Sequence, residues 1–179
     1  LAMRFGGGVS ILPVSLAVMI ALAVDTVSRR RRHRSTGLLR QHDDSHALRT
    51  SVQAPLRAAR ISSVLLFAAG GVIGIFISGN NVRIPAHYHG SIVGVTLALM
   101  GLVYHLLPQL GYRPARGRLA TLQPFLYGAG QLMHIIGLVW SGGYGVQRKV
   151  AGAEQVLRST GEVVGMGLMG LGGLIAIIG

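Results

Sequence analysis

The sequence contains no cysteine and only five acidic residues among its 179. Without cysteine there are no disulfides and no thiolate ligands, so a metal centre must use histidine, the few carboxylates, or other oxygen and sulfur donors. Asp25, Asp43 and Asp44 all lie toward one hydrophilic loop, which argues against a Ser/His/Asp nucleophile site. The glycine-rich segments lie inside apolar runs, so none of them is typical of a phosphate-binding loop.

Long apolar segments dominate what the sequence does contain. Half of the residues are hydrophobic, and only 12% are charged. Five segments have roughly the 20 residues needed to cross about 30 Å of hydrocarbon at 1.5 Å per residue. We expect these spans at residues 10–28, 58–79, 85–111, 119–144 and 155–178. Because the alternation typical of barrel strands is absent, the sequence predicts an all-α, polytopic transmembrane bundle that forms a single domain over residues 1–179.

The basic residues are distributed unevenly between the two sides of the predicted bundle. The predicted loop at residues 29–57, with "SRRRRHRS" at its head, and the loop at 111–120 lie on one side. With Arg60 at the edge of the first, they hold twelve arginines, against five Lys and Arg on the opposite side. By the positive-inside rule, the arginine-rich loops are cytoplasmic in an inner-membrane protein. The net charge of +12 then indicates topology and contact with the lipid bilayer rather than nucleic-acid binding.

Two histidines stand two residues apart in "IPAHYHG", at the start of the third predicted span. Residues i and i+2 of a helix lie about 200° apart, so His87 and His89 point to nearly opposite sides. A single metal ion would favour an i, i+4 spacing on one face. The pair therefore suits two separate centres, and haem is the candidate because imidazole is a common axial ligand. A role as anchoring or hydrogen-bonding residues at the interface is the alternative.

A second group of candidate residues follows in "GQLMHIIGLVWSGGYGVQRKVAG". His134 lies inside the fourth span, and Arg148 and Lys149 come just after its outer end. They are predicted to lie on the same side of the membrane as His87 and His89, where cations would pair with haem propionates. The alternative is that Arg148 and Lys149 are ordinary interfacial residues.

These motifs resemble a known family. "RIPAHYHGSIVGVTLALMGLVYHLLPQL" resembles the tenth helix of the haem–copper oxidase large subunit, cytochrome c oxidase subunit I. "LMHIIGLVWSGGYGVQRK" is similar to the next helix, with its histidine and arginine pair, and "LLFAAGGVIGIFISGNN" to the glycine-rich helix before. The resemblance is best over residues 65–150. It implies that the five spans correspond to helices eight to twelve of a twelve-helix subunit.

The resemblance also implies roles for single residues. His87 would be the proximal ligand of a high-spin haem, where oxygen is reduced to water, and His89 an axial ligand of a low-spin haem. Arg148 and Lys149 would hold haem propionates, and His134 matches the family's histidine in the cofactor region. Electrons would come from cytochrome c or quinol at the outer face, and protons from the cytoplasm.

The resemblance further implies partners for this chain. Copper is expected in the complete enzyme, but the family's copper ligands lie on earlier helices. We therefore expect a fragment or a split subunit that works with the remaining helices of the large subunit and with other oxidase subunits. Lys149 stands in place of an arginine and lacks the two-pronged guanidinium contact.

Three alternatives stay open from the sequence. They are a nitric oxide reductase-like large subunit, a non-catalytic haem-binding or assembly subunit, and a transporter-like bundle that uses the histidines for protons. The haem type is not readable from these residues.

Overall fold

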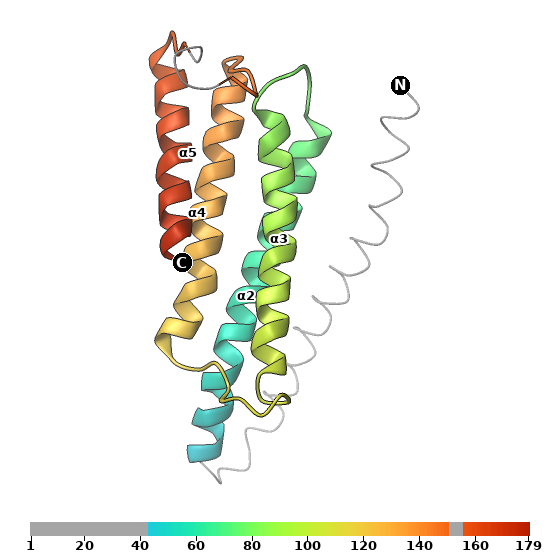
Figure 1. The fold of residues 1–179 in the computed structure, drawn as a ribbon, viewed down its shortest axis with the longest axis vertical. Helices are drawn as coiled ribbons and strands as arrows, with labels where there is room; N and C mark the ends of the chain where they lie inside the picture. Colours follow the sequence, from blue (N-terminus) through green and yellow to red (C-terminus); the bar gives the residue numbers. More distant parts are fainter. Residues whose placement is uncertain (1–42, 151–155) are drawn as a thin grey trace, which may run out of the picture. The chain divides into compact units, whose positions relative to one another are not determined.

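A computed structural model describes residues 43–150 and 156–179 (Figure 1). The helices found there are α2 (Asp43–Ile75), α3 (Arg83–Leu106), α4 (Arg118–Gly143) and α5 (Thr160–Ile178). The described residues contain no strand, and the all-α fold expected from the sequence is confirmed. The chain divides into two compact units, 1–46 and 47–179, and the second holds nearly all of the four helices. The expected span at 10–28 and the first part of the basic loop lie outside the described residues.

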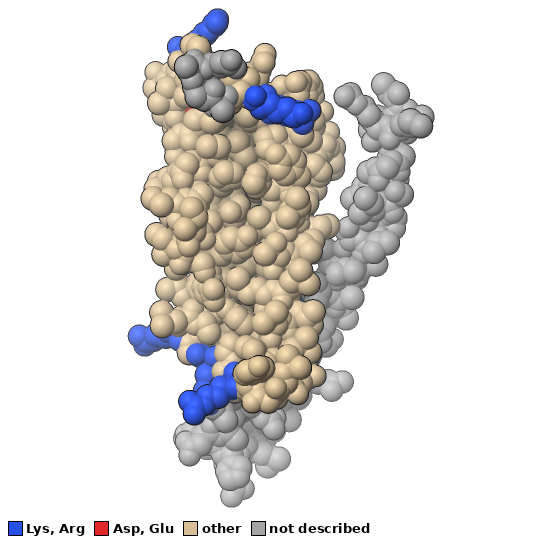
Figure 2. Space-filling view, viewed as in Figure 1, with Lys and Arg blue, Asp and Glu red and all other residues tan. Residues whose placement is uncertain are grey.

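Three of these helices are long and apolar enough to cross a membrane: Ser51–Ile75 of α2, α3 and α5. Large apolar side chains such as Leu65, Ile92 and Leu171 are exposed on them, as contact with lipid tails requires. Figure 2 shows Lys and Arg at the two ends of the visible face and an uncharged band between them. The fold is that of a helical membrane bundle.

Helix α4 has 26 residues, enough to cross a membrane, but it is not one of the three apolar helices. Gln123, Gln131 and His134 interrupt its apolar sequence. In Figure 1 it lies between α3 and α5, and both neighbours contact it through side chains or backbone. Because protein covers these two sides, less of the surface of α4 needs to be apolar. The sequence predicted an apolar span at residues 119–144.

Helix α2 begins at Asp43, well before the span expected at 58–79 and inside the segment expected to be a loop. The residues involved, "DDSHALRTSVQAPLR", include good helix formers such as Ala47, Leu48 and Gln53. Two aspartates in the first turn also favour a helix start, because they lie at the positive end of the helix dipole. Pro55 is inside the helix, and its position did not prevent the helix from extending past it.

Glycines set how closely the helices approach each other. A Cβ on Gly90 of α3 would lie 2.7 Å from Gly70 Cα and 2.9 Å from Gly70 N on α2. Between α4 and α5, a Cβ on Gly130 would lie 2.7 Å from Gly172 O, and one on Gly137 would lie 2.6 Å from Gly165 O. Small residues at such crossings bring backbones together, as in other membrane bundles.

We expect Gly90→Ala to destabilise the bundle by about 1–3 kcal/mol, the usual cost of overpacking. The added methyl group meets the backbone of Gly70, which has no flexible end to move aside. Gly71→Ala is the matched control, because nothing lies within 4 Å of a Cβ there, and alanine favours the helix. Thermal unfolding in detergent micelles measures both. Equal melting temperatures for the two variants would contradict the close α2–α3 contact.

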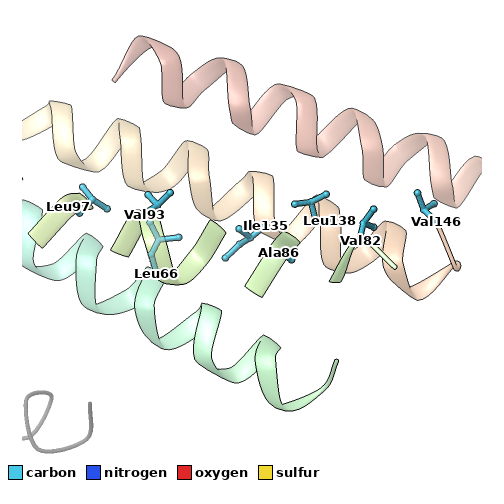
Figure 3. Packing of buried hydrophobic residues seen from close by; sticks show 8 residues of the cluster. All are labelled: Leu66, Val82, Ala86, Val93, Leu97, Ile135, Leu138 and Val146. Atoms are coloured by element: carbon cyan, nitrogen blue, oxygen red, sulfur yellow. The ribbon is translucent and has the colours of Figure 1, made fainter. Parts of the chain in front are cut away.

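The buried core links α2, α3 and α4 and continues into the connections at one end of the bundle (Figure 3). It consists of Leu66, Val82, Ala86, Val93, Leu97, Ile135, Leu138 and Val146. Val82 and Val146 lie just outside α3 and α4, so the core fixes the start of α3 against the end of α4. The histidine pair is located at this place.

Candidate functional site

The candidate site lies where α3 begins and α4 ends. We call this place the histidine end: the first two turns of α3 with the connections at residues 76–82 and 144–150. Val82 N–H donates to Val146 O at 3.0 Å, and Asn81 and Gln147 form a β-bridge. These backbone contacts join two connections that are far apart in the sequence. The residues on both therefore hold fixed positions relative to α3.

His87 is anchored to α2. Its Nδ1 lies 2.7 Å from Gly70 O, and because a carbonyl oxygen only accepts, Nδ1 carries the proton. The ring lies against Gly74, where a Cβ would come within 2.7 Å of Nδ1 and 2.8 Å of Cε1. In the neutral ring, Nε2 is therefore the nitrogen left with a lone pair, and it is available to a metal.

His89 is directed to the other side, toward α4. Its ring centroid lies 4.9 Å from that of His134, edge to face, and 5.1 Å from that of Tyr88. The structure shows no hydrogen bond from the His89 ring to any residue that it describes. His87 contacts α2 and His89 contacts α4, so the two imidazoles lie on different sides of α3.

His134 is held between α3 and α5. Its Nδ1 lies 3.0 Å from Met169 O, so this nitrogen donates to the carbonyl, while the ring edge meets His89. A Cβ on the neighbouring Gly172 would lie 2.6 Å from Gly130 O, which shows how closely α5 approaches α4 beside the ring. His134 is thus positioned to fix the orientation of His89.

The two predicted cations lie in the connection after α4, at the same end as the histidine pair. Arg148 donates through Nε to Asn80 Oδ1 in the connection before α3. Lys149 is exposed and has a positive φ of 65°, which is unusual for a residue with a side chain. The structure therefore brings Arg148 and Lys149 to the histidine end and shows no hydrogen bond between them and the two imidazoles among the residues that it describes.

Arg83 is a charged residue of this end that the sequence did not single out. It is the first residue of α3, and its Nε is buried without a hydrogen-bond partner among the described residues. A Cβ on Gly142 would lie 2.6 Å from Arg83 Cγ, and one on Gly143 would lie 3.4 Å from its Nη2. In the sequence, the consecutive glycines Gly142 and Gly143 were the only sign that another side chain could pack closely there.

The arrangement suits single-imidazole ligands rather than a chelated ion. Among the residues that the structure describes, no three His, Cys, Asp or Glu side chains gather to hold a metal ion. A structural zinc or calcium site requires four or more protein ligands. A haem iron can be held by a single protein imidazole on one axial side. His87 and His89, on different sides of one helix, each offer one.

The fold and the histidine end define a helical membrane bundle with two separately presented imidazoles. The chain is 39% identical over 135 residues to an uncharacterised protein of Rickettsia prowazekii, a match covering 69% of this chain and 26% of that protein. It is 32% identical over 107 residues to cytochrome c oxidase subunit 1 of Thermus thermophilus, covering 53% of this chain and 19% of that protein. A second Thermus thermophilus sequence of that name is 32% identical over 100 residues, covering 49% of this chain and 93% of that sequence.

The chain belongs to the family of cytochrome c oxidase subunit 1, as a distant member. It spans about a quarter or less of the longer relatives described above. No family model and no solved structure matches it. The family predicted from the histidine pair is thus supported, and the roles of single residues remain predictions.

The family implies haem, and the donor set of the histidine end fits that group. His87 already gives its Nδ1 proton to a backbone carbonyl, the outer contact that orients most metal-binding histidines. Arg83 presents a buried nitrogen without a partner among the described residues, and a haem's carboxylates would need such a cation.

Proposed function

We propose that this chain is the haem-ligating part of a respiratory terminal oxidase large subunit. His87 binds the iron of the high-spin haem, where oxygen is reduced to water, and His89 binds the iron of the low-spin haem that delivers electrons. The observation that supports the proposal is that the two histidines contact different helices. His87 contacts Gly70 and Gly74 on α2. His89 contacts His134 on α4.

The outer contacts of the histidines prepare them as ligands. Gly70 O accepts the Nδ1 proton of His87 at 2.7 Å, which fixes the tautomer and makes Nε2 a stronger donor to a metal. The His134 ring, held by Met169 O at 3.0 Å, limits the rotation of the His89 ring. When bound, haem supplies an iron whose potential depends on its axial ligand and on nearby charge.

The cations of the histidine end complete the proposed site. Arg148, tied to Asn80, and the exposed Lys149 pair with haem propionates in this proposal. The chain then works with the remaining helices of the large subunit, which supply the copper ligands, and with other oxidase subunits. In the bacterial inner membrane the histidine end faces outward, toward cytochrome c or quinol.

The test is spectroscopic, on the full-length protein that contains this chain. Membranes or detergent-purified protein should show haem absorption with one low-spin component and one high-spin component that binds carbon monoxide. Oxygen consumption with a reduced donor should accompany both signals. Protein without any haem refutes the proposal. Haem together with reduction of nitric oxide and no oxygen consumption would assign the chain to a nitric oxide reductase instead.

A further inference from the structure

The side chain of Arg83 lies against the end of α4. The backbone N–H of Arg83 donates to Asn81 Oδ1 at 3.0 Å, and the side chain passes over Gly142 and Gly143 at the end of α4. A Cβ at Gly142 would meet Arg83 Cγ at 2.6 Å, so only glycine leaves this path open. Nε is buried and has no partner among the described residues.

A buried, unpaired Arg nitrogen is costly, because arginine stays charged and loses its contact with water. No carboxylate that the structure describes offsets the cost. Within residues 51–150 and 156–179, Glu162 is the only acidic residue. Glu162 accepts from the backbone N–H groups of Arg158 at 2.5 Å and Ser159 at 3.2 Å. Among the residues that the structure describes, no side chain therefore supplies an anion to Arg83.

The surroundings favour an anion at this place. The first turn of α3 has no acidic residue, and its N-cap residue, Val82, provides no side-chain hydrogen bond. The backbone N–H groups of Arg83 and Ile84 already donate to Asn81, so what favours negative charge here is the positive end of the helix dipole. Arg148 and Lys149 add positive charge at the same end.

The contacts of the Arg83 side chain indicate which anion it can bind. Its side chain contacts α4, the helix that also contacts the His89 ring through His134. Arg83 lies four positions before His87, on the same face of α3, but its contact with Gly142 directs its side chain to α4. It lies six positions before His89, about 9 Å along the helix axis. A carboxylate that belongs to a group bound at His89 can span such a distance, whereas a small free anion gains nothing from the imidazole.

We infer that Arg83 binds a carboxylate of the haem held by His89, as an anchor provided by α3 itself in addition to Arg148 and Lys149. This inference rests on the proposed function. The planar guanidinium group matches a carboxylate with two parallel hydrogen bonds. Binding also gives the buried Nε the partner that it lacks.

The experiment compares haem with and without free carboxylates. Full-length protein made without haem and purified in detergent is titrated with haemin and with haemin dimethyl ester, whose propionates are blocked. Arg83→Gln should weaken haemin binding on the order of tenfold and leave the binding of the ester unchanged. Arg158→Gln is the control, because Arg158 is exposed on the same side of the bundle, and it should bind haemin like the wild type.

A redox titration of the haem-loaded protein gives the second readout. Loss of the cation should lower the midpoint potential of the low-spin haem, because a nearby positive charge favours the reduced state. Arg83→Lys should restore part of the potential. An equal loss of affinity for haemin and for the ester shows that Arg83 is only structural and overturns the inference. An affinity for haemin that Arg83→Gln leaves unchanged overturns it too. If the wild-type protein binds no haem, it is the proposed function that is refuted.

Discussion

Replacing His87 by alanine is expected to abolish the high-spin, carbon-monoxide-reactive haem signal of the full-length protein and to leave the low-spin absorption in place. Among the described residues, His87 is the histidine that contacts α2, so no neighbouring imidazole can take its role. The His89 ring is directed to α4 and stays available to the other haem. The measurement is the reduced spectrum with carbon monoxide minus the reduced spectrum without it. Oxygen consumption should fall to background.

Two controls separate ligation from folding. His105→Ala changes an exposed histidine at the far end of α3, where Nε2 lies 3.2 Å from Gln109 Nε2, and both haem signals should persist. In His87→Gly, the lost side chain leaves space for free imidazole, and added imidazole should restore the carbon-monoxide signal. A carbon-monoxide spectrum unaffected by His87→Ala would mean that the high-spin iron takes its ligand from elsewhere.

The sequence predicted the part of the site that depends on helix geometry alone. The spacing of His87 and His89 fixes their angular separation once the segment is helical, and the structure places the two rings against different helices. The position of Arg148 at the same end also follows from the sequence, because it comes directly after a helix that must return to that end. These predictions needed no knowledge of side-chain contacts.

The rest of the site depends on contacts between distant segments, which periodicity does not encode. Gly70 O is the partner of His87 because Gly70 and Gly90 let α2 approach α3. The unpaired Nε of Arg83 follows from its path over Gly142. In the sequence, Arg83 was simply one of a few basic residues on that side, and its burial could not be read from its neighbours.

The start of α2 shows a different limit of sequence reasoning. Hydropathy locates the part of a helix that can lie in lipid, and the apolar segment found there, Ser51–Ile75, is close to the expected span. Hydropathy does not indicate where the helix itself begins. Residues 43–50 continue the helix into polar sequence, since helix formation depends on backbone propensity and end charges rather than on lipid contact.

His89→Ala is expected to remove the low-spin haem band and to reduce oxygen consumption to background, while the carbon-monoxide signal remains. The His134 ring is a second candidate for the ligand, because its centroid lies 4.9 Å from that of the His89 ring. The structure distinguishes the two by their hydrogen bonds. His134 Nδ1 is fixed at 3.0 Å from Met169 O on α5, whereas the His89 ring has no such bond to a described residue.

The comparison with His134→Ala therefore decides which ring is the ligand. If His134 only orients His89, its loss should retain the low-spin band and shift or broaden it, because the His89 ring then rotates more freely. A band that survives His89→Ala and vanishes in His134→Ala would reverse the assignment. The division of α3 into two ligand faces would then fail, because only one of its histidines would bind a haem.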